Sequence, residues 1–504
     1  MKDIGQFDLV IIGGGINGAG IARDAAGRGL SVLMCEKGDL GEGTSSRSGK
    51  LIHGGLRYLE YYEFRLVREA LIEREVLLRA APHIVWPMRF VLPHSPEQRP
   101  AWLVRLGLFL YDHLGGRQKL PGCRSLDLSR CPEGAVIKEE YRKAFEYSDC
   151  WVDDARLVVL NALDAKSRSA RIMVRTAATS MRRHGDRWKI ELRSTDGRMQ
   201  CVHAHAVVNA AGPWVQDVIT NAAALNSSRK VRLVKGSHII VRKFWDGPHA
   251  FLFQNEDKRV IFVNPYEGDL CLIGTTDIPY EGNPEDVKIS SEEVVYLLAA
   301  VNRFLKIPLT HKDIVASYSG VRPLHDDSSS NPSAVTRDYA FDVQGSPPLL
   351  SIFGGKITTY RKLAEHALQK LKPSFPHMGP DWTAATPLPG GDMPNADFDQ
   401  FLVKLRNKFP RFPPELLLHY ARLYGTRLGE VLGTASSIDD LGMKFGSTFY
   451  EVEARHLVNN EWALSAEDIL FRRTKHGLHL SGAERAGFEA WMRGAARPEQ
   501  FLTE

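Results

Sequence analysis

Apolar and polar residues follow a strand, turn, helix, strand order in the first part of the chain. An apolar run at residues 7–12 ends in three glycines at 13–15, a helical pattern continues to Arg28, and a second apolar run covers residues 30–35. Short apolar runs bounded by glycine are typical of buried strands, and an apolar repeat every three or four residues is typical of a helix. We therefore predict a β-α-β unit at the N-terminus.

The turn in this unit fits a dinucleotide. Gly13, Gly15 and Gly18 have the spacing G-x-G-x-x-G, which allows a sharp turn, brings backbone N–H groups to a pyrophosphate and packs the helix closely on the sheet. Glu36 ends the second strand about twenty residues later, where a carboxylate accepts hydrogen bonds from a ribose. Lys37 follows it, in place of an arginine that would favour a 2′-phosphate. The motif alone does not decide between nicotinamide and flavin.

The later patterns suggest that this first domain is interrupted and resumed. Helical patterns cover residues 63–81 and 153–169, and an alternating strand pattern covers 187–193. The apolar stretch 206–214 ends in Ala-Ala-Gly-Pro, and 349–371 reads as strand, glycine turn and helix. Glycine turns thus recur at 13–18, 210–212 and 354–355. A cofactor contacted from three distant segments is long and permanently held, which favours FAD.

The remaining stretches suggest two further domains. Residues 82–150 look irregular and rich in proline, strands dominate 231–337 with a capped helix starting at Ser290 and Glu293, and 395–504 have helical periodicity. We predict an α/β plus α fold with three parts: a discontinuous Rossmann-type FAD-binding domain (1–81, 151–230 and 338–386), an antiparallel-sheet substrate or cap domain (82–150 and 231–337), and a C-terminal helical domain (395–504).

Composition adds few constraints. The 504 residues are 43% hydrophobic with a net charge of +5, so the chain can bury a large core and does not require a nucleic-acid partner. The six cysteines are scattered without metal-ligand spacing, so we expect reduced thiols, no metal and a cytosol-facing protein. The first strand starts too early for a cleavable signal, and no apolar run approaches the roughly twenty residues that span a bilayer.

One stretch could contact a membrane from the side. Residues 99–119 place Trp102, Leu103, Leu106, Phe109 and Leu110 between Arg99, Arg105, Arg117 and Lys119. This basic, amphipathic composition suits a helix in the lipid interface. A helix packed on the protein's own core is an equally good interpretation.

Several ordered blocks of sequence carry a resemblance. They include "KLIHGGLRYLEYYEFRLV" (50–67), "NAAGPWV" (209–215), "KGSHI" (235–239), "IGTTD" (273–277), "YSGVRPL" (318–324), "TRDY" (336–339) and "FGGKITTYRKLAEHAL" (353–368). From residue 8 to about 372 the chain resembles the aerobic, respiratory glycerol-3-phosphate dehydrogenases of bacteria.

The resemblance implies FAD on a D-amino-acid-oxidase-like core. It also implies oxidation of sn-glycerol 3-phosphate to dihydroxyacetone phosphate by hydride transfer to flavin N5, with electrons passed to ubiquinone. The expected protein is a homodimer, peripheral on the cytoplasmic face of the inner membrane.

The resemblance also assigns residues to FAD. These are Gly13, Gly14, Gly15, Ile16, Asn17 and Gly18 at the pyrophosphate; Glu36 and Lys37 near the ribose; Thr44, Ser45 and Ser46 as hydroxyl donors; Lys50, Leu51, Ile52 and His53 at the ring; Ala210, Ala211, Gly212 and Trp214 at the second turn; and Gly354, Gly355, Lys356 and Thr358 at the third.

The substrate calls for cations and a base. A phosphomonoester needs convergent positive charges, for which chemistry and resemblance suggest Arg57, Arg322 and Arg337, with Lys356 near the phosphate or the flavin and Tyr58 lending a hydroxyl. His53 is the first choice for the base that takes the hydroxyl proton, and His238 is the rival. We expect His53, Arg57 and Arg322 to be catalytic.

Two departures from the family and two alternative functions stay open from the sequence. Arg47 and Gly49 stand where family members carry small residues and serine, which leaves the contact at Gly49 undecided. The same fold and substrate would serve a glycerol-3-phosphate oxidase that passes electrons to oxygen, although we detect no insertion of the kind such oxidases carry. A binding or escort protein that has lost its chemistry would lack the substrate cations, which are present.

Overall fold

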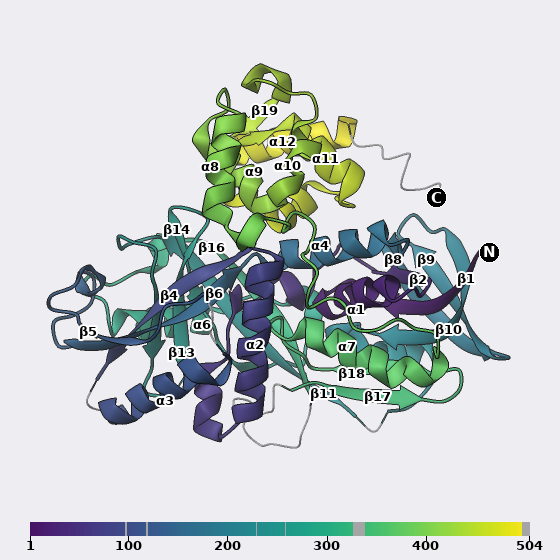
Figure 1. The fold of residues 1–504 in the computed structure, drawn as a ribbon, viewed down its shortest axis with the longest axis horizontal. Helices are drawn as coiled ribbons and strands as arrows, with labels where there is room; N and C mark the ends of the chain where they lie inside the picture. Colours follow the sequence, from purple (N-terminus) through teal and green to yellow (C-terminus); the bar gives the residue numbers. More distant parts are fainter. Residues whose placement is uncertain (96–97, 117–118, 228, 258, 326–337, 496–504) are drawn as a thin grey trace.

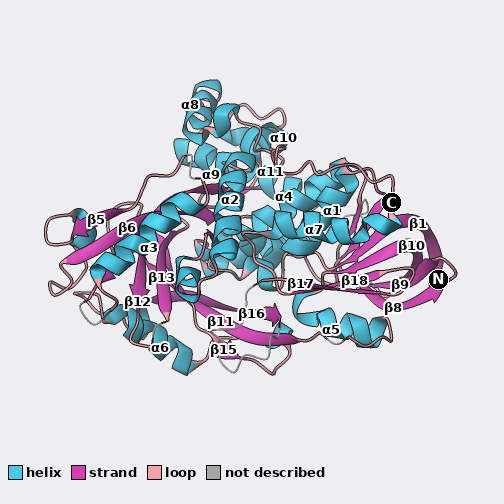
Figure 2. Cartoon of the chain, turned by 60° about the horizontal axis from the view of Figure 1, so that its bottom comes forward, coloured by secondary structure: helices cyan, strands magenta, loops and turns pink. Residues whose placement is uncertain are grey.

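Two large sheets and a helical C-terminal domain make up the protein (Figure 1). The structure is a computed structural model that describes residues 1–95, 98–116, 119–227, 229–257, 259–325 and 338–495. Figure 2 shows the strands of the two sheets as separate groups, with the helices of the C-terminal domain to one side of both.

The first sheet joins segments that are far apart in the sequence. Its strands run in the order β17-β18-β10-β1-β2-β7, and β9, which pairs with β10, carries β8. The bounds are β1 Lys2–Ile12, β2 Val32–Cys35, β7 Arg171–Met173, β8 Thr176–His184, β9 Arg187–Ser194, β10 Met199–Asn209, β17 Ala340–Gln344 and β18 Leu349–Phe353. Strands β18, β10, β1, β2 and β7 are parallel. All three segments predicted to form the discontinuous domain therefore contribute strands to one sheet.

Burial on both faces explains why the last four residues of β1, 9–12, are an unbroken apolar run. Leu9 and Ile11 join the core formed with the helices α1 (Ile16–Gly27), α4 (Asp154–Ser167) and α7 (Tyr360–Leu371). Val10 and Ile12 point to the other face and join a second core with β8, β9 and β10. Parallel strands covered on both faces have this continuous apolar pattern.

The second sheet has ten strands in the order β15-β11-β14-β13-β12-β4-β6-β3, with β16 on β11 and β5 on β6. The bounds are β3 Leu51–Ile52, β4 Val85–His94, β5 Arg124–Asp127, β6 Lys143–Val152, β11 Val231–Arg242, β12 Ala250–Gln254, β13 Val260–Tyr266, β14 Leu270–Gly274, β15 Ile278–Pro279 and β16 Ile314–His325. The helix α6 (Ser291–Asn302) packs on this sheet and has the predicted capping box of Ser290 and Glu293.

The expectation that residues 82–150 are irregular was wrong. Strand β4 is ten residues long and pairs with β6 along its whole length. Its other edge pairs with β12 only at Phe90 and Val91. Pro87 and Pro93 lie outside that short contact, so their missing N–H groups leave no gap in it.

The C-terminal domain has its own core, as predicted. Its helices are α8 Phe398–Lys408, α9 Pro414–Tyr424, α10 Leu428–Leu432, α11 Glu451–Asn460 and α12 Gly482–Ala495, and a small hairpin, β19 Lys444–Gly446 and β20 Phe449–Tyr450, was not predicted. Phe412, Tyr420, Leu457 and Phe488 belong to one buried cluster of this domain.

Helix α3 (Ala101–Leu114) is apolar on two faces, and helix α2 (Phe64–Ala80) packs beside it. Leu108 and Tyr111 of α3 are buried, whereas Trp102, Leu106 and Phe109 are 68%, 47% and 54% exposed. The burial of Leu108 and Tyr111 agrees with a helix packed on the protein's own core. Contact of the exposed residues with a membrane stays a prediction, and Arg117 lies outside the described residues. Across the described residues, no helix is long and apolar enough to span a membrane.

Candidate active site

A cavity of about 760 Å³ lies where the two sheets meet. Its walls come from the turn after β1, the loop at 36–49, the ends of β10 and β18, and strands β11, β13, β14 and β16 of the second sheet. The carboxyl ends of the parallel strands β1, β10 and β18 face this cavity. Ligands of open α/β sheets bind at such an edge.

The first glycine turn passes too close to its neighbours for side chains. A Cβ on Gly13 would lie 2.5 Å from the carbonyl oxygen of Ala210, and one on Gly18 would lie 1.9 Å from that of Gly13. The turn leads into α1, whose first turn carries no acidic residue. The start of α1 therefore presents the positive end of a helix dipole to a phosphate, and its Ile16 N–H donates to the Ser45 hydroxyl at 3.0 Å.

Glu36 ties this turn to the loop that follows β2. Its Oε2 accepts a hydrogen bond from the Gly14 N–H at 2.7 Å, and its Oε1 accepts one from the Gly38 N–H at 2.8 Å. Burial raises the pKa of Glu36, while these two N–H groups act against that rise. The residue lines the cavity where a ribose hydroxyl would need an acceptor.

His238 enters the cavity wall from β11. Its ring stacks on Tyr318 with centroids 4.8 Å apart, and a Cβ on Gly274 would lie 2.1 Å from the ring. Burial, followed by the charges of Arg322 and Lys50, lowers the pKa of His238 well below its usual value. The imidazole is therefore neutral at physiological pH, and the positive charges beside it make it a weaker base than a free imidazole.

Arg322 is held beside His238 by two side chains of the neighbouring turn. Its Nη2 donates to the Thr275 hydroxyl at 2.9 Å, and its Nη1 pairs with Asp277. A Cβ on Gly236 would lie 2.3 Å from this Nη2, so only glycine lets the guanidinium cross β11 here. The arginine is thus oriented before any substrate arrives.

Two more of the cations expected to bind the substrate, Arg57 and Lys356, line the same cavity. Arg57 belongs to the 3-10 turn Leu56–Tyr61, and the Lys356 Nζ lies 4.0 Å from the centroid of the Tyr58 ring. Arg57, Arg322 and Lys356 therefore share one pocket. Such a group of cations suits a substrate with a doubly charged phosphate.

Most residues expected at the site line this cavity. They are Gly13, Gly15, Ile16, Asn17, Glu36, Lys37, Thr44, Ser45, Leu51, His53, Arg57, Tyr58, Ala210, Ala211, Gly212, Trp214, His238, Arg322, Gly354, Gly355, Lys356 and Thr358.

Six expected residues are not part of the lining. Gly14, Gly18, Ser46, Lys50 and Ile52 lie behind it, and Arg337 is outside the described residues. The Lys50 Nζ instead pairs with the buried Asp154 at 2.7 Å and donates to the Ser46 carbonyl at 3.1 Å. The direct contacts assigned to these residues stay predictions.

The sequence did not reveal the partners of Arg322. Thr275 and Asp277 stand in the block "IGTTD", which was recognised without any role for either side chain. Their place beside Arg322 follows from the pairing of β11 with both β14 and β16. Thr176, Ala177 and Ala178 of β8 also line the cavity, and no sequence signal marked them.

The two departures from the resemblance also face the cavity. The Arg47 Nη1 donates to the Ser319 carbonyl at 3.2 Å, and the Gly49 carbonyl accepts from the Asn264 amide at 3.3 Å. A Cβ on Gly49 would lie 3.8 Å from Nε2 of His238. Residue 49 is therefore next to the imidazole.

The fold and the glycine turns define a class of protein. Residues 8–361 match the family of FAD dependent oxidoreductases, and residues 382–489 match the C-terminal domain of alpha-glycerophosphate oxidase. The chain belongs to the FAD-dependent oxidoreductases, and its cofactor is FAD.

The most similar relatives and solved structures include dehydrogenases of polyol phosphates. The chain is 63% identical to a D-erythritol 1-phosphate dehydrogenase of Brucella abortus, over 97% of this chain and 98% of that one. It is 52% identical to the aerobic glycerol-3-phosphate dehydrogenase of Escherichia coli, over 96% and 97%. Among solved structures, a glycerol-3-phosphate dehydrogenase of Bacillus halodurans complexed with FAD has a TM-score of 0.74 at 26% identity, over 97% and 94%. The resemblance stated from the sequence blocks is confirmed.

The cavity residues fit FAD. The glycine turn accepts a pyrophosphate and Glu36 offers an acceptor to a ribose, while the buried Oδ1 of Asn17 has no hydrogen-bond partner among the described residues. Buried polar atoms of this kind normally have a partner. A bound cofactor would supply one.

Proposed function

We propose that the protein oxidises sn-glycerol 3-phosphate to dihydroxyacetone phosphate and that its electrons pass to ubiquinone. The relatives named glycerol-3-phosphate dehydrogenase, at 52% and 53% identity, support this substrate. The observation that carries the proposal is that His238, Arg57, Arg322 and Lys356 line the same cavity as the glycine turn. When bound, FAD supplies a hydride acceptor at N5 of its ring.

The side chains divide the work of binding and proton transfer. Arg57, Arg322 and Lys356 bind the phosphate oxygens and so fix the position of the carbon chain. The Nε2 of His238 accepts the hydroxyl proton, because this atom lies beside Gly49 of the cavity wall. A bound phosphate offsets the charge of Arg322 and so raises the pKa of His238 toward the range of a general base. His53 lines the same cavity and is the alternative base.

D-erythritol 1-phosphate is a second candidate substrate. The relative that carries this name shares 63% of its residues with the chain, more than the relatives named for glycerol 3-phosphate. Both compounds are phosphate monoesters of small polyols, so the same cations and the same base serve either. Gly49 leaves space beside His238 that a longer polyol could use.

The acceptor distinguishes a dehydrogenase from an oxidase. We propose ubiquinone as the electron acceptor, in keeping with the relative named aerobic glycerol-3-phosphate dehydrogenase, and oxygen is the alternative. The hydrogen peroxide formed per substrate consumed in air separates the two. A yield near one would replace the quinone proposal with the oxidase.

A peripheral place on the cytoplasmic face of the inner membrane completes the proposal, with a homodimer as the assembly. Trp102, Leu106 and Phe109 form an exposed apolar face on α3, and Arg105 is exposed on the same helix. Apolar area beside positive charge is what interfacial helices use to bind anionic lipid. Size measurement in detergent tests the dimer.

Anaerobic spectroscopy tests the reaction directly. The absorbance of the FAD-loaded protein at about 450 nm should fall when substrate is added. The same absorbance should return when a quinone analogue is added. The ratio of kcat/KM values for glycerol 3-phosphate and D-erythritol 1-phosphate then identifies the substrate. Unchanged absorbance with both compounds would contradict the proposal.

A further inference from the structure

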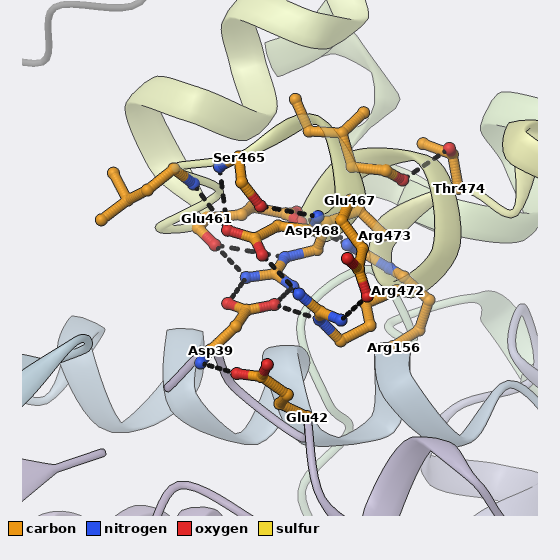
Figure 3. Close-up of polar contacts among 12 residues, drawn as sticks. Asp39, Glu42, Arg156, Glu461, Ser465, Glu467, Asp468, Arg472, Arg473 and Thr474 are labelled. Atoms are coloured by element: carbon orange, nitrogen blue, oxygen red, sulfur yellow. Dashed lines mark hydrogen bonds and ion pairs between the residues drawn. The ribbon is translucent and has the colours of Figure 1, made fainter. Parts of the chain in front are cut away.

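Asp39 lies in the FAD-binding loop but is held by the C-terminal domain. It belongs to the loop between β2 and the 3-10 turn Thr44–Ser46, and its side chain is fully buried. Both oxygens are bound by Arg473, Nη1 to Oδ2 at 2.7 Å and Nη2 to Oδ1 at 2.8 Å. The Arg472 Nε adds a third bond to Oδ2 at 2.6 Å. Figure 3 shows both arginines reaching Asp39 from the C-terminal domain.

The two arginines are themselves fixed in place. They end the π-helical turn Asp468–Arg473, where Arg472 also pairs with Asp468. The Arg473 Nη2 donates to the carbonyl of Glu461 at 2.8 Å. These charges hold the pKa of Asp39 below its usual value although burial alone would raise it. The contact is therefore a bidentate, charge-assisted bond between rigid partners.

On its other side, the loop is bonded to the phosphate turn. Glu36 accepts the N–H groups of Gly14 and Gly38, the Gly41 N–H donates to the Gly14 carbonyl at 3.0 Å, and the Ser45 hydroxyl accepts from the Ile16 N–H at 3.0 Å. The Asp39 N–H donates to Glu42 at 2.6 Å. Asp39 does not line the cavity, whereas Glu36, Gly38 and Ser45 do.

We propose that the C-terminal domain positions the FAD-binding loop through Asp39, so that Arg472 and Arg473 set how tightly the protein holds FAD. The bonds run without a break from Arg473 through Asp39 and the loop to Glu36 and the glycine turn. Asp39, Arg472 and Arg473 are positioning residues, because they act through the loop. The proposal concerns FAD alone and is independent of the identity of the substrate.

A second contact between the same domains provides a matched control. Arg156 of α4 pairs with Glu461 of the C-terminal domain, and its Nη2 lies 3.0 Å from Oε1 of Glu461. Both side chains are as buried as those of Asp39 and Arg473. This pair joins the C-terminal domain to α4 and makes no contact with residues 36–46 in the bonds described. The Glu461 carbonyl that accepts from Arg473 is a backbone group and is retained in Glu461→Gln, so this variant weakens domain docking while the Arg473–Asp39 contact is kept.

The first test compares FAD affinity in variants of the two contacts. Arg473→Met should raise the dissociation constant of FAD, measured by flavin fluorescence, by about tenfold or more, the range of coupling between two sites in one protein. Arg473→Lys keeps the charge but loses the bidentate bond, so its loss should be smaller. Glu461→Gln should lower the unfolding temperature and leave FAD affinity unchanged. Equal losses in Arg473→Met and Glu461→Gln, or none in Arg473→Met, would overturn the proposal.

A second test uses only the wild-type protein, so it can be carried out even if Arg473→Met does not fold. Coupling is reciprocal, so removing FAD from the wild-type protein should speed amide hydrogen exchange in two places, residues 36–46 and residues 468–473. Exchange in α8 (Phe398–Lys408) of the C-terminal domain is the internal reference, because α4 contacts the turn Thr44–Ser46. Faster exchange in the loop without any change at 468–473 would show that the C-terminal domain does not sense FAD.

Discussion

His238 and Arg322 each lie against a strand position where only glycine leaves room. Gly274 of β14 borders the imidazole, and Gly236 of β11 borders the guanidinium. The two functional side chains thus depend on residues that carry no functional group. Substituting the functional side chain in one variant and the neighbouring glycine in another distinguishes the chemical role of the first from the steric role of the second.

Arg322→Ala should impair substrate use without loss of FAD. The arginine lines the proposed phosphate pocket and contacts Thr275 and Asp277. Because charge-assisted bonds contribute about 1.5–3 kcal/mol each, KM should rise by one to two orders of magnitude or more. Steady-state kinetics and the flavin spectrum measure the two effects, and a colourless protein would mean that Arg322 belongs to the cofactor site.

Gly236→Ala should have a similar but smaller effect. The new methyl group would lie 2.3 Å from the Arg322 Nη2 and displace it, so KM should rise while FAD remains bound. Gly429→Ala is the control, since a Cβ on Gly429 in α10 meets nothing within 4 Å. Equal kinetics for both variants would disprove the role given to Gly236.

His238→Gln should lower kcat by about 10²–10⁴-fold, the usual contribution of a general base. In the wild type, the depressed pKa of His238 keeps the ring neutral, so kcat/KM should fall only at a pH well below the ordinary histidine value of about 6.5. His53→Gln, measured over the same pH range, is the comparison. If only His53→Gln abolishes the acid limb of the profile, His53 is the base.

At the scale of elements, α3 is the membrane candidate. Trp102→Ser with Phe109→Ser should reduce sedimentation with anionic vesicles at low salt, because exposed apolar area drives interfacial binding. Higher salt should weaken wild-type binding by screening the positive charges. Val403→Ser changes an equally exposed residue on α8 and serves as control. Vesicle binding that does not change in the double variant would remove α3 from the proposal.

Elements with a strong local signal could be predicted from the sequence. The turn at Gly13, the capped helix at Ser290 and the return to the first sheet at 349–353 are local patterns and were recognised. Strand β4 was missed because its prolines are tolerated only where no neighbour strand needs their N–H groups. The role of Asp277 could not be predicted for the same reason. It pairs with Arg322 only because β11 lies between β14 and β16 in the sheet.

At the scale of the whole molecule, the C-terminal domain contains a buried cluster of ionisable groups. Glu453 accepts hydrogen bonds from His419 at 2.8 Å, from Tyr424 at 2.8 Å and from His476 at 3.3 Å. Burial, followed by the neighbouring His419, lowers the pKa of His476 to about 4. Burial alone would raise the pKa of Glu453, but its interactions with His419 and the hydrogen bond from His476 hold that pKa below its usual value.

This cluster should make the fold sensitive to acid. The unfolded chain protonates His476 near pH 6.5 but the folded protein does so only near about 4, so folding stability should fall as pH drops through this interval. Glu453 contributes stability above its unfolded pKa of about 4.5 that is lost at lower pH. Unfolding temperature against pH measures both effects. His476→Gln should flatten the curve between pH 6.5 and 4, and an unaltered slope would exclude His476 as the cause.

The position of β1 in the first sheet has a consequence for synthesis on the ribosome. Its neighbours are β2 and β10, and β10 in turn needs β18 (Leu349–Phe353). At about 5–20 residues per second, the nascent chain carries an apolar N-terminal strand for many seconds before its second neighbour exists. The yield of active protein should therefore depend on chaperones that shield such strands during synthesis.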